Sequence, residues 1–87
     1  MRIIWTTHAE DRQKQWERKL GISRQEVEDA LRNPEQVVPG DRDALVAQRR
    51  RGNGLLRVPF VEVEGNKRVL TVYWTSRVEK YWKGGTE

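Results

Sequence analysis

The hydrophobic positions at the start of the chain first suggest a strand and then repeat with a helical period. Residues 2–6 form a short β-branched and aromatic stretch, which predicts a strand. Apolar residues then recur at helical spacing up to Gly21, so we expect a helix that ends at this glycine. Thr7 and Glu10 have the spacing of a capping box, which places the predicted start of the helix near His8.

A second helix follows, and both of its ends carry signals. Ser23 is a favourable N-cap residue, and Glu26 lies three residues later, where it can close a capping box. The apolar stripe of this helix consists of Val27, Ala30 and Leu31. Asn33-Pro34 is expected to end the helix, because the residue before a proline is pushed out of the helical region.

From residue 36 onward, short apolar runs alternate with turn residues. The predicted strands are 36–38, 44–49, 55–64 and 68–74. Pro59 within the third run is typical of a bulge or of a sheet edge, and Gly65-Asn66 has the composition of a two-residue hairpin turn. Residues 68–74 are apolar on both faces, so we expect them to form a central strand. A last helical turn is predicted within 76–83.

These elements predict a single α+β domain over residues 1–83. Its N-terminal strand and two helices would pack on a three- or four-stranded antiparallel sheet, because helices and strands are grouped along the chain. The 87 residues are enough for one hydrophobic core. Residues 84–87 are expected to form a disordered tail.

Composition narrows the possible chemistry. The chain has no cysteine and one histidine, so it offers neither a disulfide framework nor a recognisable zinc set, and we predict no metal and no cofactor. No glycine-rich phosphate loop leads from a strand into a helix, which argues against nucleotide hydrolysis. The short apolar runs and the lack of a signal-peptide pattern favour a cytoplasmic protein that does not bind membranes.

Positive charge is concentrated in the second half of the chain. The net charge is +4, and residues 67–83 carry five Lys or Arg against one Glu, whereas residues 24–35 carry two Arg against four carboxylates. Such a cationic side attracts phosphate or an acidic protein. Arg49, Arg50 and Arg51 lie between the two regions and are candidate contacts for an RNA backbone. Alternatively, they keep a strand end charged against association.

Several residues, in this order and spacing, resemble the domain of unknown function family 4258. They are His8, Ala9, Arg12, residues 21–23, Val27, Leu31, Asn33, Pro34 and the strand 69–74. That family is grouped with the RelE/ParE-like toxins, small proteins whose sheet cradles RNA or another target and which a paired antitoxin silences. The resemblance implies this fold, with RNA and an antitoxin-like protein as partners. The catalytic tyrosine of the ribonuclease toxins could correspond only to Tyr81.

The candidate catalytic residues suit RNA cleavage without a metal ion. His8 could take the proton from a 2′-hydroxyl, while Arg12 and Arg57 hold the phosphate and stabilise its developing charge. Tyr73 or Tyr81 could act as the acid. In the alternative interpretation, His8 only opens a helix, Arg12 pairs with a neighbour, and Arg57 covers the sheet face with its aliphatic stem.

Aromatic residues lie among cations near the end of the chain. Lys80 lies between Tyr73-Trp74 and Tyr81-Trp82, a pattern that permits stacking on unpaired bases, although a small domain needs most of its tryptophans for the core. The apolar strand 55–63 also allows a homodimer or an antitoxin segment that pairs at a sheet edge, as an alternative to a monomer.

Two hypotheses follow from the sequence. The first is a toxin-like, RNA-directed module that acts as a metal-independent endoribonuclease. The second is a non-catalytic module that binds an acidic protein or nucleic acid through the same basic face. Convergence of His8, Arg12 and Arg57 on one concavity would favour the first hypothesis, whereas positions on separate surfaces would argue against catalysis.

Overall fold

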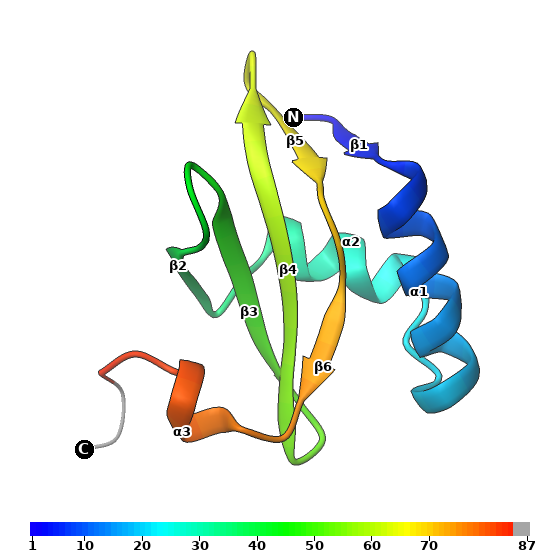
Figure 1. The fold of residues 1–87 in the computed structure, drawn as a ribbon, viewed down its shortest axis with the longest axis vertical. Coiled ribbons are helices and arrows are strands. Elements are labelled where there is room, and N and C mark those ends of the chain that lie inside the picture. Colours follow the sequence, from blue (N-terminus) through cyan, green and yellow to red (C-terminus); the bar gives the residue numbers. More distant parts are fainter. Residues whose placement is uncertain (85–87) are drawn as a thin grey trace.

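The computed structural model describes residues 1–84 and forms an α+β domain, as predicted (Figure 1). Its elements are β1 (Ile3–Trp5), α1 (Thr7–Leu20), α2 (Arg24–Arg32), β2 (Gln36–Pro39), β3 (Leu45–Arg51), β4 (Gly54–Val63), β5 (Asn66–Val69), β6 (Tyr73–Thr75) and α3 (Val78–Tyr81). The tail predicted from residue 84 falls mainly on residues 85–87, which lie outside the described residues. No helix in residues 1–84 is long and apolar enough to cross a membrane.

The strands form one mixed sheet that is larger than the sequence predicted. Its order is β1-β5-β4-β3-β2, and β6 also pairs with β4. β1 runs parallel to β5, whereas the other pairs are antiparallel. The strand count exceeds the predicted three or four because residues 3–5 join the same sheet and the run 68–74 forms two strands. β4 has neighbours on both sides, so the prediction that residues 55–63 offer a free edge is wrong.

Pro59 lies in the inner strand β4, at the point where the hydrogen-bond ladder is interrupted. β6 pairs with residues 55–57 and β5 with residues 60–63 on the same side of β4. The Pro59 carbonyl accepts a hydrogen bond from the Leu70 amide on that side at 2.9 Å. Because the N–H and C=O of a strand residue point to the same side, the missing N–H faces this gap. The predicted single strand 68–74 is therefore wrong, and Pro59 is not at an edge.

The hairpin turn and the helix caps form where the sequence predicted them, except that the β4–β5 turn and the N-cap of α1 each lie one residue earlier. The hairpin turn between β4 and β5 consists of Glu64 and Gly65, with φ of 53° and 80°, rather than the predicted Gly65-Asn66. Two positive φ angles are typical of a type I′ turn. Ser23 caps α2 as predicted, since its hydroxyl accepts a hydrogen bond from the Glu26 amide at 3.1 Å.

Helix α1 begins one residue earlier than predicted because Thr6, rather than Thr7, is its N-cap. The Thr6 hydroxyl accepts a hydrogen bond from the Ala9 amide at 3.1 Å and donates one to the Val69 carbonyl at 2.9 Å. One side chain therefore caps α1 and joins the helix to β5.

Thr6→Ala is expected to lower the free energy of unfolding by about 1–2 kcal/mol, because it removes both hydrogen bonds of the hydroxyl. The expected fall in melting temperature is about 4–8 °C for each kcal/mol in a domain of this size. Thr7→Ala is the matched control, and its effect should stay within about 0.5 kcal/mol. Equal effects of the two substitutions in thermal unfolding would contradict the assignment of the cap.

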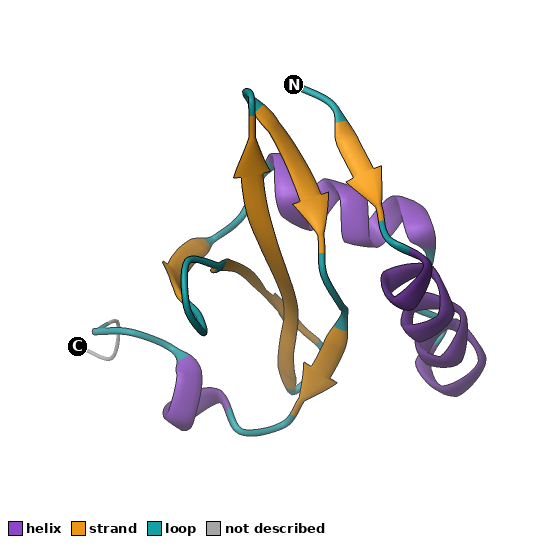
Figure 2. Ribbon diagram, turned by 45° about the horizontal axis from the view of Figure 1, so that its top comes forward, coloured by secondary structure: helices purple, strands orange, loops and turns teal. Residues whose placement is uncertain are grey.

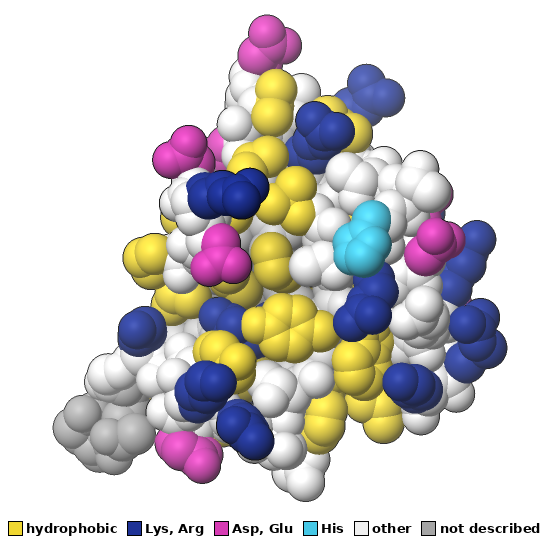
Figure 3. Space-filling model, viewed as in Figure 1, with side chains coloured by type: hydrophobic (Ala, Val, Ile, Leu, Met, Phe, Trp, Pro, Cys, Tyr) yellow, Lys and Arg dark blue, Asp and Glu magenta, His cyan; other side chains and the backbone are white. Residues whose placement is uncertain are grey.

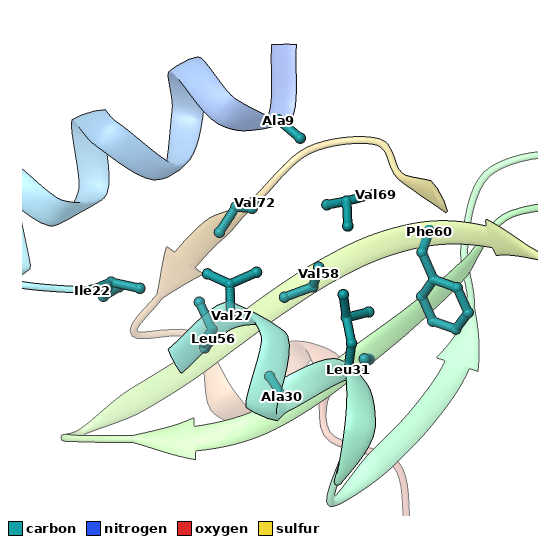
Figure 4. Close-up of a cluster of buried hydrophobic side chains, with 11 residues drawn as sticks. Ala9, Ile22, Val27, Ala30, Leu31, Leu56, Val58, Phe60, Val69 and Val72 are labelled. Atoms are coloured by element: carbon teal, nitrogen blue, oxygen red, sulfur yellow. The ribbon is translucent and has the colours of Figure 1, made fainter. Parts of the chain in front are cut away.

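The core lies between the two long helices and one face of the sheet, while α3 lies on the other side of the sheet (Figure 2). Val27 and Leu31 of α2 pack with Leu56, Val58 and Phe60 of β4, and all five are buried (Figure 4). Side chains alternate between the faces of a strand, so residues 55, 57 and 59 point to the opposite face. That face, which we call the open face, carries the candidate site.

Candidate functional site

A row of four polar side chains crosses the open face of the sheet. The strand register places Gln36 of β2 opposite Gln48 of β3, Gln48 opposite Arg57 of β4, and Arg57 opposite Tyr73 of β6. Directly paired residues share a face of the sheet, so these side chains are neighbours on the open face.

Arg57 is the centre of this row, and only 7% of its surface is exposed. Its Nε donates a hydrogen bond to Gln48 Oε1 at 2.6 Å, and its Nη1 donates one to the Tyr73 hydroxyl. The Tyr81 ring covers the guanidinium, with 3.9 Å between the ring centroid and Cζ. Within residues 1–84, no carboxylate forms an ion pair with Arg57. Arg57 is thus a nearly buried positive charge without a protein counter-ion.

The row opens into a groove of about 1130 Å³. Its polar lining side chains are Asp41, Arg42, Arg57, Thr71, Tyr73, Lys80, Tyr81 and Lys83. Four cations against one carboxylate give the groove a net positive charge. Figure 3 shows Lys and Arg side chains gathered around apolar and aromatic side chains on this side of the molecule. The groove therefore suits an anionic ligand.

Tyr73 keeps its phenolic proton in the folded protein. Burial raises the pKa of its hydroxyl above the usual value, the neighbouring Tyr81 adds to this, and Arg57 acts in the opposite direction. The hydroxyl therefore remains protonated at neutral pH. Its oxygen accepts a hydrogen bond from Arg57, and a hydrogen bond with the Tyr81 side chain is among the causes of the raised pKa.

Two glutamines attach the C-terminal segment to the row. Gln48 Nε2 donates hydrogen bonds to Gln36 Oε1 at 3.0 Å and to the Tyr81 carbonyl at 3.2 Å. Gln36 binds both the carbonyl and the amide of Lys83, at 2.7 and 3.1 Å. α3 is a single turn without a side-chain cap, so these bonds and the Tyr81 ring hold it on the sheet.

The sequence did not identify these glutamines as functional candidates. Gln48 is fully buried and stands in β3 between the apolar residues 45–47 and the arginines 49–51. A buried polar side chain requires hydrogen-bond partners. What marks Gln48 as a candidate is its position opposite Arg57 in the pair of β3 and β4. The sequence alone does not give the register of that pair, so it could not identify Gln48.

The structure places four of the predicted site residues in the groove, namely Arg57, Tyr73, Lys80 and Tyr81. His8 and Arg12 belong to α1 and are not among the residues that line the groove, so the expected convergence of His8, Arg12 and Arg57 on this concavity is not observed. His8 is exposed in the first turn of α1. Arg12 is half-buried, and its Nε is buried with no hydrogen-bond partner within residues 1–84.

The three consecutive arginines lie outside the groove lining, and each has a contact of its own. Arg51 forms an ion pair with Glu26 at 2.8 Å. Arg49 donates a hydrogen bond to the Asn33 carbonyl at 3.4 Å. The exposed Arg50 stacks on Trp82, with 4.5 Å between its Cζ and the ring centroid. The three side chains are thus engaged by the protein itself.

Within the described residues, no group of three His, Asp or Glu side chains is placed to hold a metal ion.

Comparison with known proteins identifies the family. Neither a curated protein nor a solved structure matches the chain. A family model does match, over residues 5–74, which is most of the chain. The chain therefore belongs to the family described as Domain of unknown function (DUF4258), as the order of its residues had indicated.

Proposed function

We propose that this protein is an RNA-directed module of the RelE/ParE-like toxin type, which holds an RNA phosphate at Arg57 and cleaves the chain without a metal ion. One observation carries the proposal, namely the nearly buried guanidinium of Arg57 without a counter-ion at the base of a cationic groove. A buried charge is costly unless it is paired. A phosphodiester would supply the missing negative charge, and a guanidinium donates charge-assisted hydrogen bonds to its oxygens.

The surroundings of Arg57 favour a nucleic acid over a simple anion. Next to the polar row, Val38, Val46 and Pro59 lie opposite one another on β2, β3 and β4, and all three line the groove. Apolar surface beside a phosphate-binding cation suits a nucleotide, whose base can pack while its phosphate is held. Lys80 and Lys83 extend the positive charge along the groove for neighbouring phosphates.

The groove also contains groups for strand cleavage by the 2′-hydroxyl. In this reaction, the 2′-oxygen attacks the phosphorus and the bond from phosphorus to the 5′-oxygen breaks. Arg57 stabilises the additional charge on the non-bridging oxygens, and Tyr73 donates its proton to the departing 5′-oxygen. Asp41, the one carboxylate in the groove lining, accepts the proton of the 2′-hydroxyl.

Asp41→Asn is expected to slow cleavage of labelled single-stranded RNA by about 100-fold, since positioned general bases contribute on that order. The measurement is the single-turnover rate with metal ions chelated. His8→Ala is the matched comparison, because His8 is the candidate base that the sequence suggested, whereas the groove lining does not include it.

The two variants distinguish the possible outcomes of this experiment. Unchanged cleavage in His8→Ala with loss in Asp41→Asn would support the proton path through the groove. Loss of cleavage in His8→Ala with unchanged cleavage in Asp41→Asn would instead identify His8 of α1 as the base. Salt-sensitive binding without any cleavage would overturn the catalytic part of the proposal, and the absence of both would overturn the whole proposal.

A further inference from the structure

We infer that Gln48 is a positioning residue of the groove, which fixes Arg57 with a neutral acceptor and so leaves the charge of Arg57 for the anion of the ligand. The inference rests on the proposed function. Gln48 is fully buried, and its Oε1 accepts the 2.6 Å hydrogen bond from Arg57 Nε.

The hydrogen bonds of Arg57 determine which part of its guanidinium faces the ligand. Nε is bound by Gln48 and Nη1 by Tyr73, which fixes the plane of the group from two sides. Nη2 donates to no residue within the described part of the chain, and it is not fully buried. Both N–H groups of Nη2 are therefore left for an anion, and they are held in a defined direction before the ligand arrives.

An amide suits this position better than a carboxylate for two reasons. A carboxylate beside Nε would pair with Arg57 and neutralise the charge that the ligand needs. It would also lack the N–H donors that Gln48 Nε2 directs to Gln36 Oε1 and to the Tyr81 carbonyl. Only an amide accepts from Arg57 and donates to these two oxygens at the same time.

Gln48→Glu is therefore expected to weaken binding of poly-uridylate by about tenfold or more, because it replaces the anion of the ligand with one from the protein. Gln15→Glu is the matched control. It adds the same charge at an exposed position of α1, outside the groove lining, and should weaken binding by less than about threefold. Equal losses in the two variants would overturn the inference, because they would report only added negative charge.

The loss in Gln48→Glu should reverse as the pH falls. The adjacent Arg57 lowers the pKa of an introduced glutamic acid, whereas burial at this position raises it, so affinity should recover as the pH falls through the pKa of this carboxyl. The charged and titratable groups of the neighbouring elements are Tyr73, Tyr81, Lys80, Lys83, Arg42 and Asp41. The recovery is measured as the ratio of the affinities of the variant and of the unaltered protein, so that any effect of pH common to both cancels. A ratio that does not change with pH would overturn the charge argument.

A second measurement does not depend on RNA. The Nε–H signal of Arg57 in nitrogen-15 NMR should exchange slowly with water in the unaltered protein and become fast in Gln48→Leu, which keeps a side chain of similar size but has no acceptor. Fast exchange in the unaltered protein would overturn the positioning role. If the unaltered protein does not bind poly-uridylate, the proposed function is wrong. The exchange rate of the Arg57 Nε–H still shows in that case whether Gln48 holds Arg57.

Discussion

Replacing Tyr73 by phenylalanine is expected to slow RNA cleavage by about 100-fold or more, since a positioned general acid contributes about 10² to 10⁴ in rate, and to weaken RNA binding by a clearly smaller factor, since Gln48 still holds Arg57 Nε. The substitution keeps the ring beside Arg57 and removes only the hydroxyl that accepts its hydrogen bond. The measurements are the single-turnover rate and the dissociation constant for the same RNA. Loss of affinity equal to the loss of rate would contradict the role of an acid.

Tyr81→Phe is the comparison that assigns the proton. The Tyr81 ring stacks on Arg57, and phenylalanine keeps this contact. A smaller loss of rate than in Tyr73→Phe is expected, and a larger one would move the acid to Tyr81.

The pH dependence of the Tyr73 variant provides a further check. The pKa of Tyr73 is raised, mainly by burial, so the folded protein keeps this proton at a pH where the unfolded chain has lost it. The resulting contribution to stability is complete below about pH 10, the ordinary tyrosine pKa, and is lost as the pH rises through the folded value. The decline of the unfolding free energy above pH 10 should therefore be smaller in Tyr73→Phe than in the unaltered protein.

Arg57→Lys is expected to weaken RNA binding by about 10- to 100-fold, although the charge is unchanged. An ammonium cannot offer the planar fork that contacts Gln48, Tyr73 and a phosphate together, and each charge-assisted hydrogen bond contributes about 1.5–3 kcal/mol. Arg50→Lys is the matched control, because Arg50 is exposed and stacks on Trp82 outside the groove lining. Its affinity should stay within about threefold of the original, and thermal unfolding of both variants checks that the fold is intact.

The parts of the fold that depend on neighbouring residues could be predicted from the sequence. Ser23 and Gly21 mark helix ends through their own side chain or backbone conformation. The pairing of β1 with β5 could not be predicted, because a parallel pair needs a long connection and leaves no turn signal between its strands. The break in the run 68–74 was missed because its cause, Pro59, lies on another strand.

The same distinction applies to the candidate site. The alternation of Leu56, Arg57 and Val58 correctly indicated that Arg57 points away from the core face. Its hydrogen bonds to Gln48 and Tyr73 depend on the register of three strands, which periodicity does not define. The position of His8 relative to the groove depends on how α1 packs, and the spacing of His8 and Arg12 within one helix carries no information about that.

The parallel pairing of β1 with β5 has a consequence for the order of folding during synthesis. Ile3 pairs with Lys67, so the first strand has no partner until more than two-thirds of the chain has been made. β2, β3 and β4 pair with their immediate neighbours in sequence and can associate earlier. Contacts between such distant residues slow folding because the loop between them must close first. The N-terminal strand is therefore expected to join the sheet late, after the hairpin of β4 and β5 has formed the edge that receives it.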